Sequence, residues 1–228
     1  MALRFPLWWC LPPLLVGLLV ALGACDGGDG GVSDPREQLP RMVLRLEDLP
    51  DGYVPDDPSF TSNEDLALGD EEKAAELEEQ GRILGYTAPF SRRDDVSAEE
   101  APIFGVESSA SLYAAETGAS ASYGAAVDEA RATDWEAILQ FGDTKTEEVA
   151  RSIGDETLWI RVTGVVALGE GQTSVLVIDD QILFRQGRAR GFLRASAAME
   201  GSSDRGALME EVAKLAEEQA SRMDDALD

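Results

Sequence analysis

Apolar residues recur along this chain with two spacings, and the change between them separates the expected strands from the expected helices. Alternating apolar and polar positions predict strands over residues 82–90 and 103–113. The second half is expected to be a meander of short strands, with turns at 142–143, 154–155, 169–171, 179–180 and 187. Its strands are predicted at residues 147–152, 158–163, 175–178, 182–185 and 188–197.

Three stretches carry apolar residues three or four positions apart, which is the spacing of a helix with one buried face. Asp70 is expected to cap a helix over residues 71–80 that ends at Gly81. Residues 117–132 form a second expected helix, whose small side chains allow close packing on a sheet. The strongest helix is predicted over residues 204–226, with a stripe made of Leu208, Val212, Leu215, Gln219 and Met223.

This order of elements predicts the fold class. Strands that follow one another in the sequence favour an antiparallel sheet, and the stripe of the last helix is expected to face that sheet. A coiled-coil partner is the alternative for this stripe, although about three heptads is short for one. We therefore expect one α+β domain over residues 41–228. It should contain an antiparallel sheet of about five to seven strands, with helices packed on one face and a long C-terminal helix.

The N-terminal residues have the pattern of a bacterial export signal. Arg4 supplies a positive charge, and residues 5–22 are almost entirely apolar. A transmembrane anchor is the alternative, because a spanning helix needs about 20 apolar residues. Pro12 and Pro13 disfavour a regular helix within this run, which favours the export signal.

The end of the apolar run decides between the two interpretations. Its sequence Leu22-Gly23-Ala24-Cys25 resembles the lipobox of bacterial lipoproteins, in which small residues precede a cysteine. The resemblance implies that residues 1–24 are removed as a signal peptide, and that Cys25 becomes the new N-terminus and carries lipid. The lipid anchor is then expected to hold the protein on the extracytoplasmic face of the cell membrane.

Residues 25–40 are expected to link the lipid to the folded domain. Residues 26–31 alternate Asp with Gly pairs, and such a segment behaves as a flexible tether because it has few side chains to bury. A calcium loop is the alternative, but it needs more carboxylates at fixed spacing and a distant bidentate Glu. No metal site is therefore assigned.

The overall charge limits the partners of the domain. The chain has 44 Asp and Glu residues against 19 Lys and Arg residues, for a net charge of −25. A field of this sign repels nucleic acid and anionic membrane surfaces, so no nucleic-acid partner is expected. Solubility alone would also account for such a charge.

The chain contains no histidine. This excludes Ser-His-Asp and Cys-His catalysis, His-based zinc sites and haem ligation by His. Cys10 is expected to leave with the signal peptide and Cys25 to carry lipid, so the folded domain has no disulfide and no free thiol. Pairs of carboxylates remain available for hydrolysis, but no local motif marks one, and no Gly-rich phosphate loop is present. No catalytic residue and no cofactor are assigned, and the protein is not expected to be an enzyme.

Positive charge gathers in one region of this acidic domain. Side chains two apart on a strand share a face, so alternate residues of the strand at 188–197 are predicted to point to the open side of the sheet. We expect the polar residues of the strand at 158–163 on that same side, which makes a basic and aromatic face for an anionic envelope component. The alternative is that these arginines pair with the domain's own carboxylates. The predicted face consists of Trp159, Arg161, Arg188, Arg190, Phe192 and Arg194.

Three short motifs resemble a group of uncharacterised bacterial lipoproteins. They are Leu49-Pro50-x-Gly52-Tyr53, Gly154-Asp155-Glu156 and Phe184-Arg185-x-Gly187, and the long final helix follows them. That group is distantly similar to the extracytoplasmic sensor domains of actinobacterial serine/threonine kinases, and the likeness extends over most of residues 40–228. Those sensor domains often carry disulfides, whereas this chain has none. The resemblance implies an α+β fold and a binding role rather than catalysis.

The leading hypothesis is therefore a lipid-anchored, extracytoplasmic domain that binds or senses a ligand without catalysis. Its partner is expected to be an anionic envelope component or another envelope protein. A carrier of an apolar envelope molecule is the second hypothesis, because a curved sheet under helices can enclose such a ligand. A hydrolase that works through paired carboxylates is the third hypothesis.

Replacement of the predicted lipid attachment site tests the anchor. Cys25→Ser is expected to abolish lipidation and to block signal cleavage or release the domain. The physical reason is that stable membrane residence needs more than one acyl chain, at about 0.8 kcal/mol per buried CH₂. Metabolic labelling with a fatty acid measures the change, and Cys10→Ser is the matched control that should keep the label. Equal label in Cys25→Ser and wild type would contradict the anchor.

Overall fold

The structure is a computed structural model of the chain, and it describes residues 34–139, 141–167, 174–199 and 204–228. Four predictions lie outside the described residues: the signal peptide, the lipid on Cys25, the first part of the tether and the turn at 169–171. In the described part of the chain, no helix is both long and apolar enough to cross a membrane.

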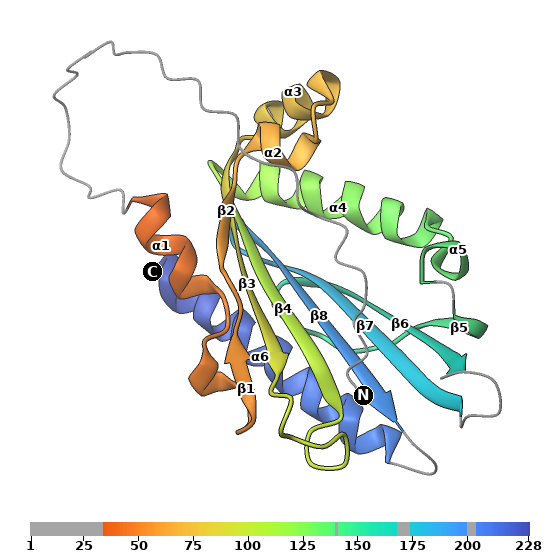
Figure 1. Cartoon of the computed structure of the whole chain (residues 1–228). Coiled ribbons are helices and arrows are strands. Elements are labelled where there is room, and N and C mark those ends of the chain that lie inside the picture. The colour runs from red at the N-terminus through yellow and green to blue at the C-terminus, as the bar shows by residue number, and fades with distance from the viewer. Residues whose placement is uncertain (1–33, 140, 168–173, 200–203) are drawn as a thin grey trace, which may run out of the picture. The chain divides into compact units, whose positions relative to one another are not determined.

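An antiparallel sheet of eight strands forms the middle of the domain, which confirms the predicted α+β class (Figure 1). Seven strands follow the order β1-β3-β4-β8-β7-β6-β5, and β2 pairs separately with β3. The strands are β1 (Tyr53–Pro55), β2 (Ser59–Thr61), β3 (Arg82–Arg92), β4 (Ile103–Tyr113), β5 (Gly142–Glu148), β6 (Glu156–Ala167), β7 (Ser174–Gln186) and β8 (Ala189–Met199).

The three helices that the sequence predicts, at residues 71–80, 117–132 and 204–226, begin and end within one residue of the expected bounds. Asp70 accepts a hydrogen bond from the backbone of Lys73 and caps α3, and Asp204 caps α6 in the same way. The long C-terminal helix α6 confirms the strongest helix of the sequence pattern. The helical elements are α1 (Pro35–Met42), a 3-10 turn η1 (Leu46–Asp48), α2 (Asn63–Ala67), α3 (Glu71–Glu79), α4 (Glu116–Ala132), α5 (Trp135–Leu139) and α6 (Arg205–Leu227).

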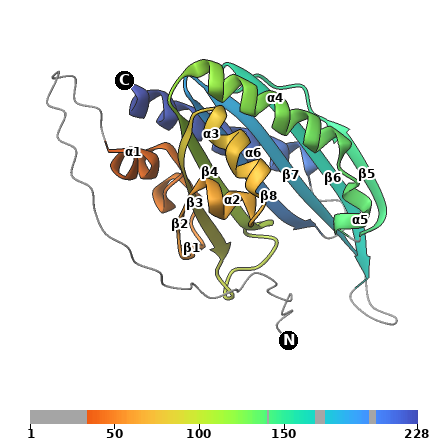
Figure 2. The ribbon, with the colours of Figure 1, turned by 90° about the horizontal axis from the view of Figure 1, so that it is seen from above.

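Helices cover both faces of the sheet, whereas the order of elements in the sequence predicts helices on one face. The Arg190 side chain of β8 contacts Ser122 of α4, while a side chain at the next position, Gly191, would meet Met223 of α6. Adjacent residues of a strand point to opposite faces, so the sheet has an α4 face, which includes Arg190, and an α6 face, which includes Gly191. Figure 2 shows the two helices with the sheet between them. The prediction differed because strands that are buried on both sides lose a clear alternation of apolar positions.

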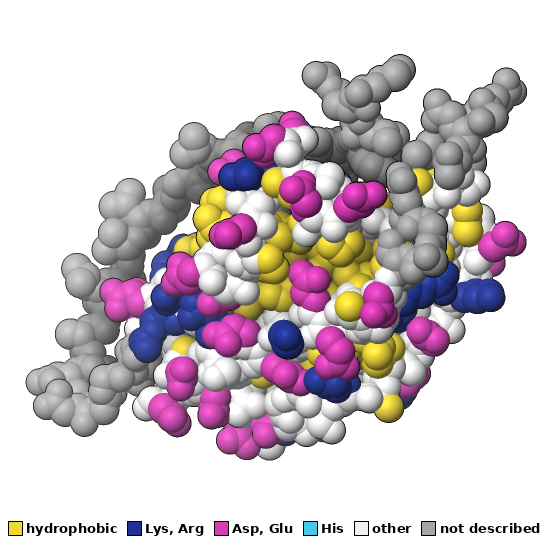
Figure 3. All heavy atoms as spheres, turned by 90° about the horizontal axis from the view of Figure 1, so that it is seen from below, with side chains coloured by type: hydrophobic (Ala, Val, Ile, Leu, Met, Phe, Trp, Pro, Cys, Tyr) yellow, Lys and Arg dark blue, Asp and Glu magenta, His cyan; other side chains and the backbone are white. Residues whose placement is uncertain are grey.

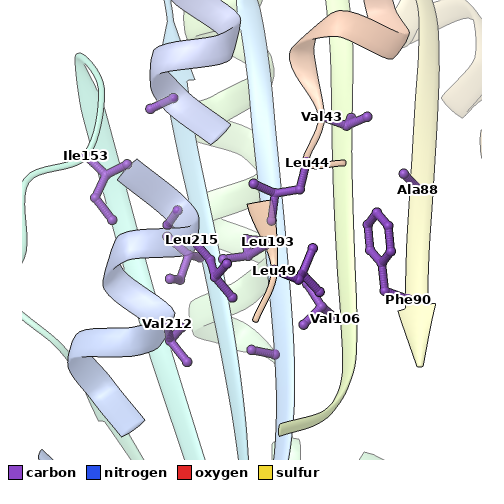
Figure 4. Close-up of a cluster of buried hydrophobic side chains, with 14 of the residues drawn as sticks. Val43, Leu44, Leu49, Ala88, Phe90, Val106, Ile153, Leu193, Val212 and Leu215 are labelled. Carbon is purple, nitrogen blue, oxygen red and sulfur yellow. The ribbon is translucent and has the colours of Figure 1, made fainter. Parts of the chain in front are cut away.

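The main core fills the α6 face. Val212 and Leu215 of α6 belong to the same buried cluster as Leu193 of β8, and Figure 4 shows them side by side. All five residues of the predicted α6 stripe are buried, which confirms that this helix packs on its own sheet. The apolar segment after α1 closes one end of the core, where Leu44 and Leu49 belong to the same cluster (Figure 4).

A smaller apolar cluster lies on the α4 face. Its buried members are Leu158, Ile160 and Val162 of β6, and residues of α4 and α5 pack against them. Tyr113 and Ser122 share a hydrogen bond of 2.6 Å between their hydroxyl oxygens, which links β4 to α4. Both faces of β6 are therefore covered, by this cluster on the α4 face and by the main core, which includes Trp159, on the α6 face.

The predicted tether ends earlier than expected, because residues 35–42 form helix α1. The Asp34 side chain caps this helix, and Leu39 and Met42 are buried in the main core. Pro40 suggested a linker, since proline lacks the N–H that a helix interior uses. Burial of two large apolar side chains offsets that missing hydrogen bond.

The turn predicted at residues 179–180 is absent, because β7 continues through it. Asp179 and Asp180 are 2% and 1% exposed, and each pairs with an arginine of a neighbouring strand. Asp179 meets Arg194 of β8 on the α4 face, and Asp180 meets Arg161 of β6 on the α6 face. Paired carboxylates can be buried, so the two charges do not interrupt the strand.

The edge strand also differs from the prediction at 147–152, because β5 occupies residues 142–148 instead. The Val149 N–H still donates to the Trp159 carbonyl of β6 at 2.9 Å. Beyond it the chain reaches α6, where Arg151 forms ion pairs with Glu210 at 3.3 Å and with Glu217 at 3.0 Å. These contacts account for the early end of the strand.

Two of the three motifs form one corner of the fold. Gly154 and Gly187 have φ angles of 62° and 52°, which favour glycine. The Asp155 carboxylate accepts a hydrogen bond of 2.8 Å from the Gly187 N–H. Arg185 forms ion pairs with Asp155 at 3.0 Å and with Glu156 at 2.5 Å. The motifs therefore hold the start of β6 against the end of β7.

The third motif anchors the N-terminal segment to the sheet. Leu49 and Tyr53 lie in the main core, and Gly52 between them has a φ angle of 107°. The Tyr53 hydroxyl donates a hydrogen bond of 2.8 Å to the carbonyl of Ile103 in β4. All three motifs have structural roles.

A charge placed under α6 should destabilise the domain. Leu215 is 4% exposed, so Leu215→Asp would bury a carboxylate without a partner and should cost about 3 kcal/mol or more of unfolding free energy. Urea denaturation followed by circular dichroism measures the loss. Glu218→Ala on the exposed side of the same helix is the control and should change little. An unchanged midpoint for Leu215→Asp would show that the stripe does not face the sheet.

Candidate functional site

The six residues predicted to share a ligand face do not lie together. Trp159 and Arg161 point to the α6 face, because the strand register places Trp159 beside Ile182 and Ile182 beside Leu193. The prediction was wrong for these two residues, since the polar positions of β6 are buried rather than open. Three members do share the α4 face, as the strand spacing predicts: Arg190, Phe192 and Arg194.

Trp159 and Arg161 belong to a buried polar cluster around Asp180. Arg161 donates two hydrogen bonds of 2.8 Å from Nε and Nη2 to the two oxygens of Asp180, and Trp159 Nε1 donates one of 2.7 Å. The exposed fractions are 1% for Trp159, 5% for Arg161 and 1% for Asp180. This cluster stabilises the centre of the sheet and presents no surface to a ligand.

Arg188 lies in the turn before β8 and forms hydrogen bonds to two other elements. It donates to the carbonyl of Tyr113 at 3.3 Å and to Oε1 of Gln38 at 3.4 Å. These contacts join the turn to β4 and α1. Arg188 is not among the residues that line the groove described next.

A groove of about 280 Å³ opens on the α4 face over β3, β4, β7 and β8. Arg82 and Arg190 lie in its wall, Phe192 and Leu183 contribute apolar surface, and Glu107 adds an acid. The groove thus combines two cations, one acid and an apolar floor. Hydroxyl groups complete the polar lining, from Thr61, Thr87, Ser109 and Ser111.

The register of three strands brings these residues together. One row across the α4 face runs from Gly85 through Ser111 to Arg190. The next row runs from Thr87 through Ser109 to Phe192, and the Thr87 and Ser109 hydroxyl oxygens are 3.0 Å apart. The basic part of the groove therefore lies one row away from its aromatic part.

Glu107 lies in the third row, opposite Arg194. Burial raises the pKa of Glu107 above its ordinary value, and the positive charge of Arg194 lowers it by less. Arg194 also forms an ion pair of 2.8 Å with Asp179. Ser196 Oγ donates a further hydrogen bond of 2.8 Å to the Asp179 carboxylate.

A second groove of about 500 Å³ lies beside α5, between the end of α4 and the strands β5 and β6. Its arginine, Arg131, already forms two hydrogen bonds of 2.8 Å and 3.0 Å to Glu148. This cation is therefore neutralised by the protein itself and offers less to a ligand.

The rest of the described surface is rich in acids. In the view from below, acidic side chains surround a central hydrophobic patch (Figure 3). Within residues 34–139, 141–167, 174–199 and 204–228, no group of three or more His, Cys, Asp or Glu side chains is placed to hold a metal ion. The groove on the α4 face can hold a ligand by charge, by hydroxyl groups and by apolar contact.

The comparisons with known proteins bear on the fold. No protein-family model matches the chain, and no curated protein matches it. Among solved structures, the chain is similar to the extracellular domain of PknH from Mycobacterium tuberculosis, with 12% sequence identity and a TM-score of 0.50. The alignment covers 84% of this chain and 100% of that chain. A likeness at this level of identity shows a shared fold.

Sequence reasoning missed two charged residues of the groove, Arg82 and Glu107. Both lie on strands that the sequence predicts correctly, at the first position of β3 and within β4. The available signal was position, since a charged residue inside an alternating apolar strand faces either solvent or a site. The register that brings Arg82 close to Arg190 could not be derived from spacing within one strand.

Removal of the Asp180 carboxylate from the buried cluster should lower the free energy of unfolding. Asp180→Ala leaves the Arg161 guanidinium buried without a carboxylate, and we expect a loss of about 3–5 kcal/mol of unfolding free energy. Chemical denaturation measures it. Glu148→Ala breaks the exposed pair with Arg131 and serves as the control, with a much smaller expected loss. Similar losses for the two variants would refute a supporting role for the cluster.

The raised pKa of Glu107 predicts a pH dependence. A carboxyl whose folded-state pKa is raised contributes stability at low pH, and that contribution is lost as the pH rises through the folded pKa. Glu107→Gln cannot ionise, so it should gain stability relative to wild type as the pH rises from acidic to neutral. Unfolding free energies measured across this range test the trend.

Glu100→Gln is the matched control for that series. A backbone hydrogen bond from Ser97 lowers the pKa of Glu100, so its carboxylate adds stability at neutral pH that is lost on acidification. Glu100→Gln should therefore show the opposite trend relative to wild type. The same trend in both glutamine variants would contradict a raised pKa for Glu107.

Proposed function

We propose that this chain is an extracytoplasmic, lipid-anchored domain that binds a ligand in the groove on its α4 face and catalyses no reaction. The lipobox-like sequence before Cys25 supports the anchor. The likeness to an extracellular domain supports a place outside the cytoplasm. The ligand comes from the cell envelope in this proposal, where the domain reports or retains it.

The observation that carries the proposal is the groove itself. The neighbouring part of the α4 face is closed by an apolar cluster under α4 and α5. Over β3, β4 and β8 the same face keeps charged and hydroxyl side chains around a hollow. Polar groups in such a place contribute less to stability than apolar packing would, which supports a binding role for them.

The lining of the groove favours binding over the other two hypotheses. A carrier of a large apolar molecule needs a mainly apolar cavity, whereas charged and hydroxyl side chains make up much of this lining. Hydrolysis by paired carboxylates needs two acids that face the substrate. Glu107 is the one acid that lines the groove among the described residues, and Asp179 is covered by its contacts with Arg194 and Ser196.

Ligand capture with a blocked groove tests the proposal. Ser109 lies between Thr87 and Phe192, so Ser109→Trp should fill the groove with its larger side chain. The full chain is incubated with fractionated envelope extract and analysed by native mass spectrometry. Wild type is expected to gain a discrete added mass, and Ser109→Trp is expected to lose it.

Thr146→Trp is the matched control, because it places the same side chain in the second groove. This variant should capture the ligand as wild type does. Equal capture by Ser109→Trp, or conversion of the captured substance into a product, would contradict a non-catalytic domain that binds in the first groove.

A further inference from the structure

We infer that Arg82 and Arg190 form a site for an oxyanion, so that the ligand carries a carboxylate or a phosphate group on a small organic body. This inference rests on the proposed binding function and names the ligand class of the same groove. Four observations carry it: the absence of a carboxylate partner, the repulsion between the two cations, the fixed geometry of the pair and the opposite character of the remaining groove.

Neither arginine contacts a carboxylate in the described part of the chain. Arg82 donates to neutral oxygens of Ser111, Asn63 and Thr61, at 3.3, 2.9 and 3.1 Å. Arg190 donates to the hydroxyl and carbonyl oxygens of Ser122, at 2.8 and 3.3 Å. In a chain with 44 acidic residues against 19 basic ones, two neighbouring cations left with neutral partners are unexpected.

The nearby arginines of the same face show the contrast. Arg185 lies directly opposite Arg190 in the register and pairs with Asp155 and Glu156. Arg194, two residues further along β8, pairs with Asp179. The protein thus neutralises the arginines on either side and leaves Arg190 to the groove.

The charge of Asp65 also acts on Arg82, but its carboxylate has another role. One oxygen of Asp65 accepts hydrogen bonds from the Ser62 backbone N–H at 3.1 Å and from the Ser62 hydroxyl at 2.9 Å. This is the capping box of α2. Asp65 is therefore held at the start of a helix and forms no ion pair with Arg82.

The two cations disfavour each other where they are. Arg82 is 5% exposed, and burial lowers its pKa. The positive charge of Arg190 lowers this pKa further. Both effects reflect a charge that lacks a partner. An oxyanion between the guanidinium groups would remove the repulsion and supply charge-assisted hydrogen bonds, which are the strong kind.

The geometry of the pair is set before a ligand arrives. Three neutral acceptors hold the Arg82 guanidinium in place. Gly85 leaves room for this guanidinium, because a Cβ atom at position 85 would overlap its Nη2 atom. Arg190 uses Nη1 for Ser122, while Nε and Nη2 have no hydrogen-bond partner among the described residues. Donors that are already ordered lose little entropy on binding.

The remaining groove selects the body of the ligand. Phe192 and Leu183 offer apolar contact next to the basic pair, and the Ser109 hydroxyl can accept or donate a hydrogen bond. Glu107 would repel a second negative group. The groove of about 280 Å³ therefore suits a small molecule with one anionic end and a neutral or cationic other end.

Inorganic phosphate is the first probe. Thermal unfolding of the full chain is followed in increasing phosphate, with chloride at the same ionic strength as the reference, because a ligand of the folded state raises the midpoint as its concentration grows. Wild type is expected to show a saturable rise. Arg190→Gln should weaken phosphate binding by about tenfold or more, since it removes charged hydrogen bonds.

Ser122→Ala is the matched control. It removes the hydrogen bond between Arg190 Nη1 and Ser122 Oγ, as Arg190→Gln does, and also the hydrogen bond between Ser122 and Tyr113, but it keeps both guanidinium groups. It therefore loosens α4 without removing a cation from the groove. Ser122→Ala should retain the phosphate response, measured against its own midpoint in chloride. A response in Arg190→Gln as strong as that of wild type, or no response in wild type, would overturn the oxyanion site.

A second experiment distinguishes two sources of the anion, a lipid headgroup and a soluble molecule. The chain is reconstituted in phosphatidylcholine vesicles with and without phosphatidylglycerol. A rise in the midpoint that needs both phosphatidylglycerol and Arg190 assigns the site to a lipid headgroup, whereas a response to phosphate alone assigns it to a soluble anion. If an envelope ligand is captured by wild type and equally by Arg190→Gln, the oxyanion site is refuted while the binding function stands.

Discussion

Two adjacent carboxylates in the middle of β7 determine how both faces of the sheet are built. Asp180 is buried under α6 and holds Arg161, and Asp179 is buried on the α4 face and holds Arg194. A buried carboxylate is costly unless it is paired and hydrogen-bonded, and each of these two carboxylates binds one arginine of a neighbouring strand. The apolar core forms around the first pair. The second pair lies beside the groove, where Arg190 remains free of a carboxylate among the described residues.

The sequence was most informative where one face of an element is buried. The α6 stripe, the helix caps at Asp70 and Asp204, and the strand at 103–113 follow from spacing and capping alone. Predictions from the sequence were wrong where both faces of a strand are buried, or where charged side chains pair between neighbouring strands. Asp179-Asp180 resembles a turn until the arginines opposite are known, and the faces of β6 cannot be told apart because apolar clusters cover both. Arg82 lies in the groove because of the register between strands, and the pattern within one strand does not determine that register.

The shared fold and the groove carry different information. The motifs Gly154-Asp155-Glu156 and Phe184-Arg185-x-Gly187 close a corner of the sheet, so a resemblance based on them follows the fold rather than a ligand site. The likeness to the extracellular domain of PknH is likewise a likeness of fold, at 12% identity. Function must be argued from the side chains of the site itself. In this chain those are two cations without carboxylate partners among the described residues, an apolar floor and one acid.

The central claim is that the arginine pair of the α4 face receives an anion, while the arginine of the α6 face supports the sheet. Nuclear magnetic resonance of the arginine Nε–H groups distinguishes these roles within one sample during a phosphate titration. The account predicts saturable changes at Arg82 and Arg190 with a common dissociation constant, and an unchanged signal from Arg161. Unchanged signals from Arg82 and Arg190, or equal and unsaturable changes at all arginines, would contradict it.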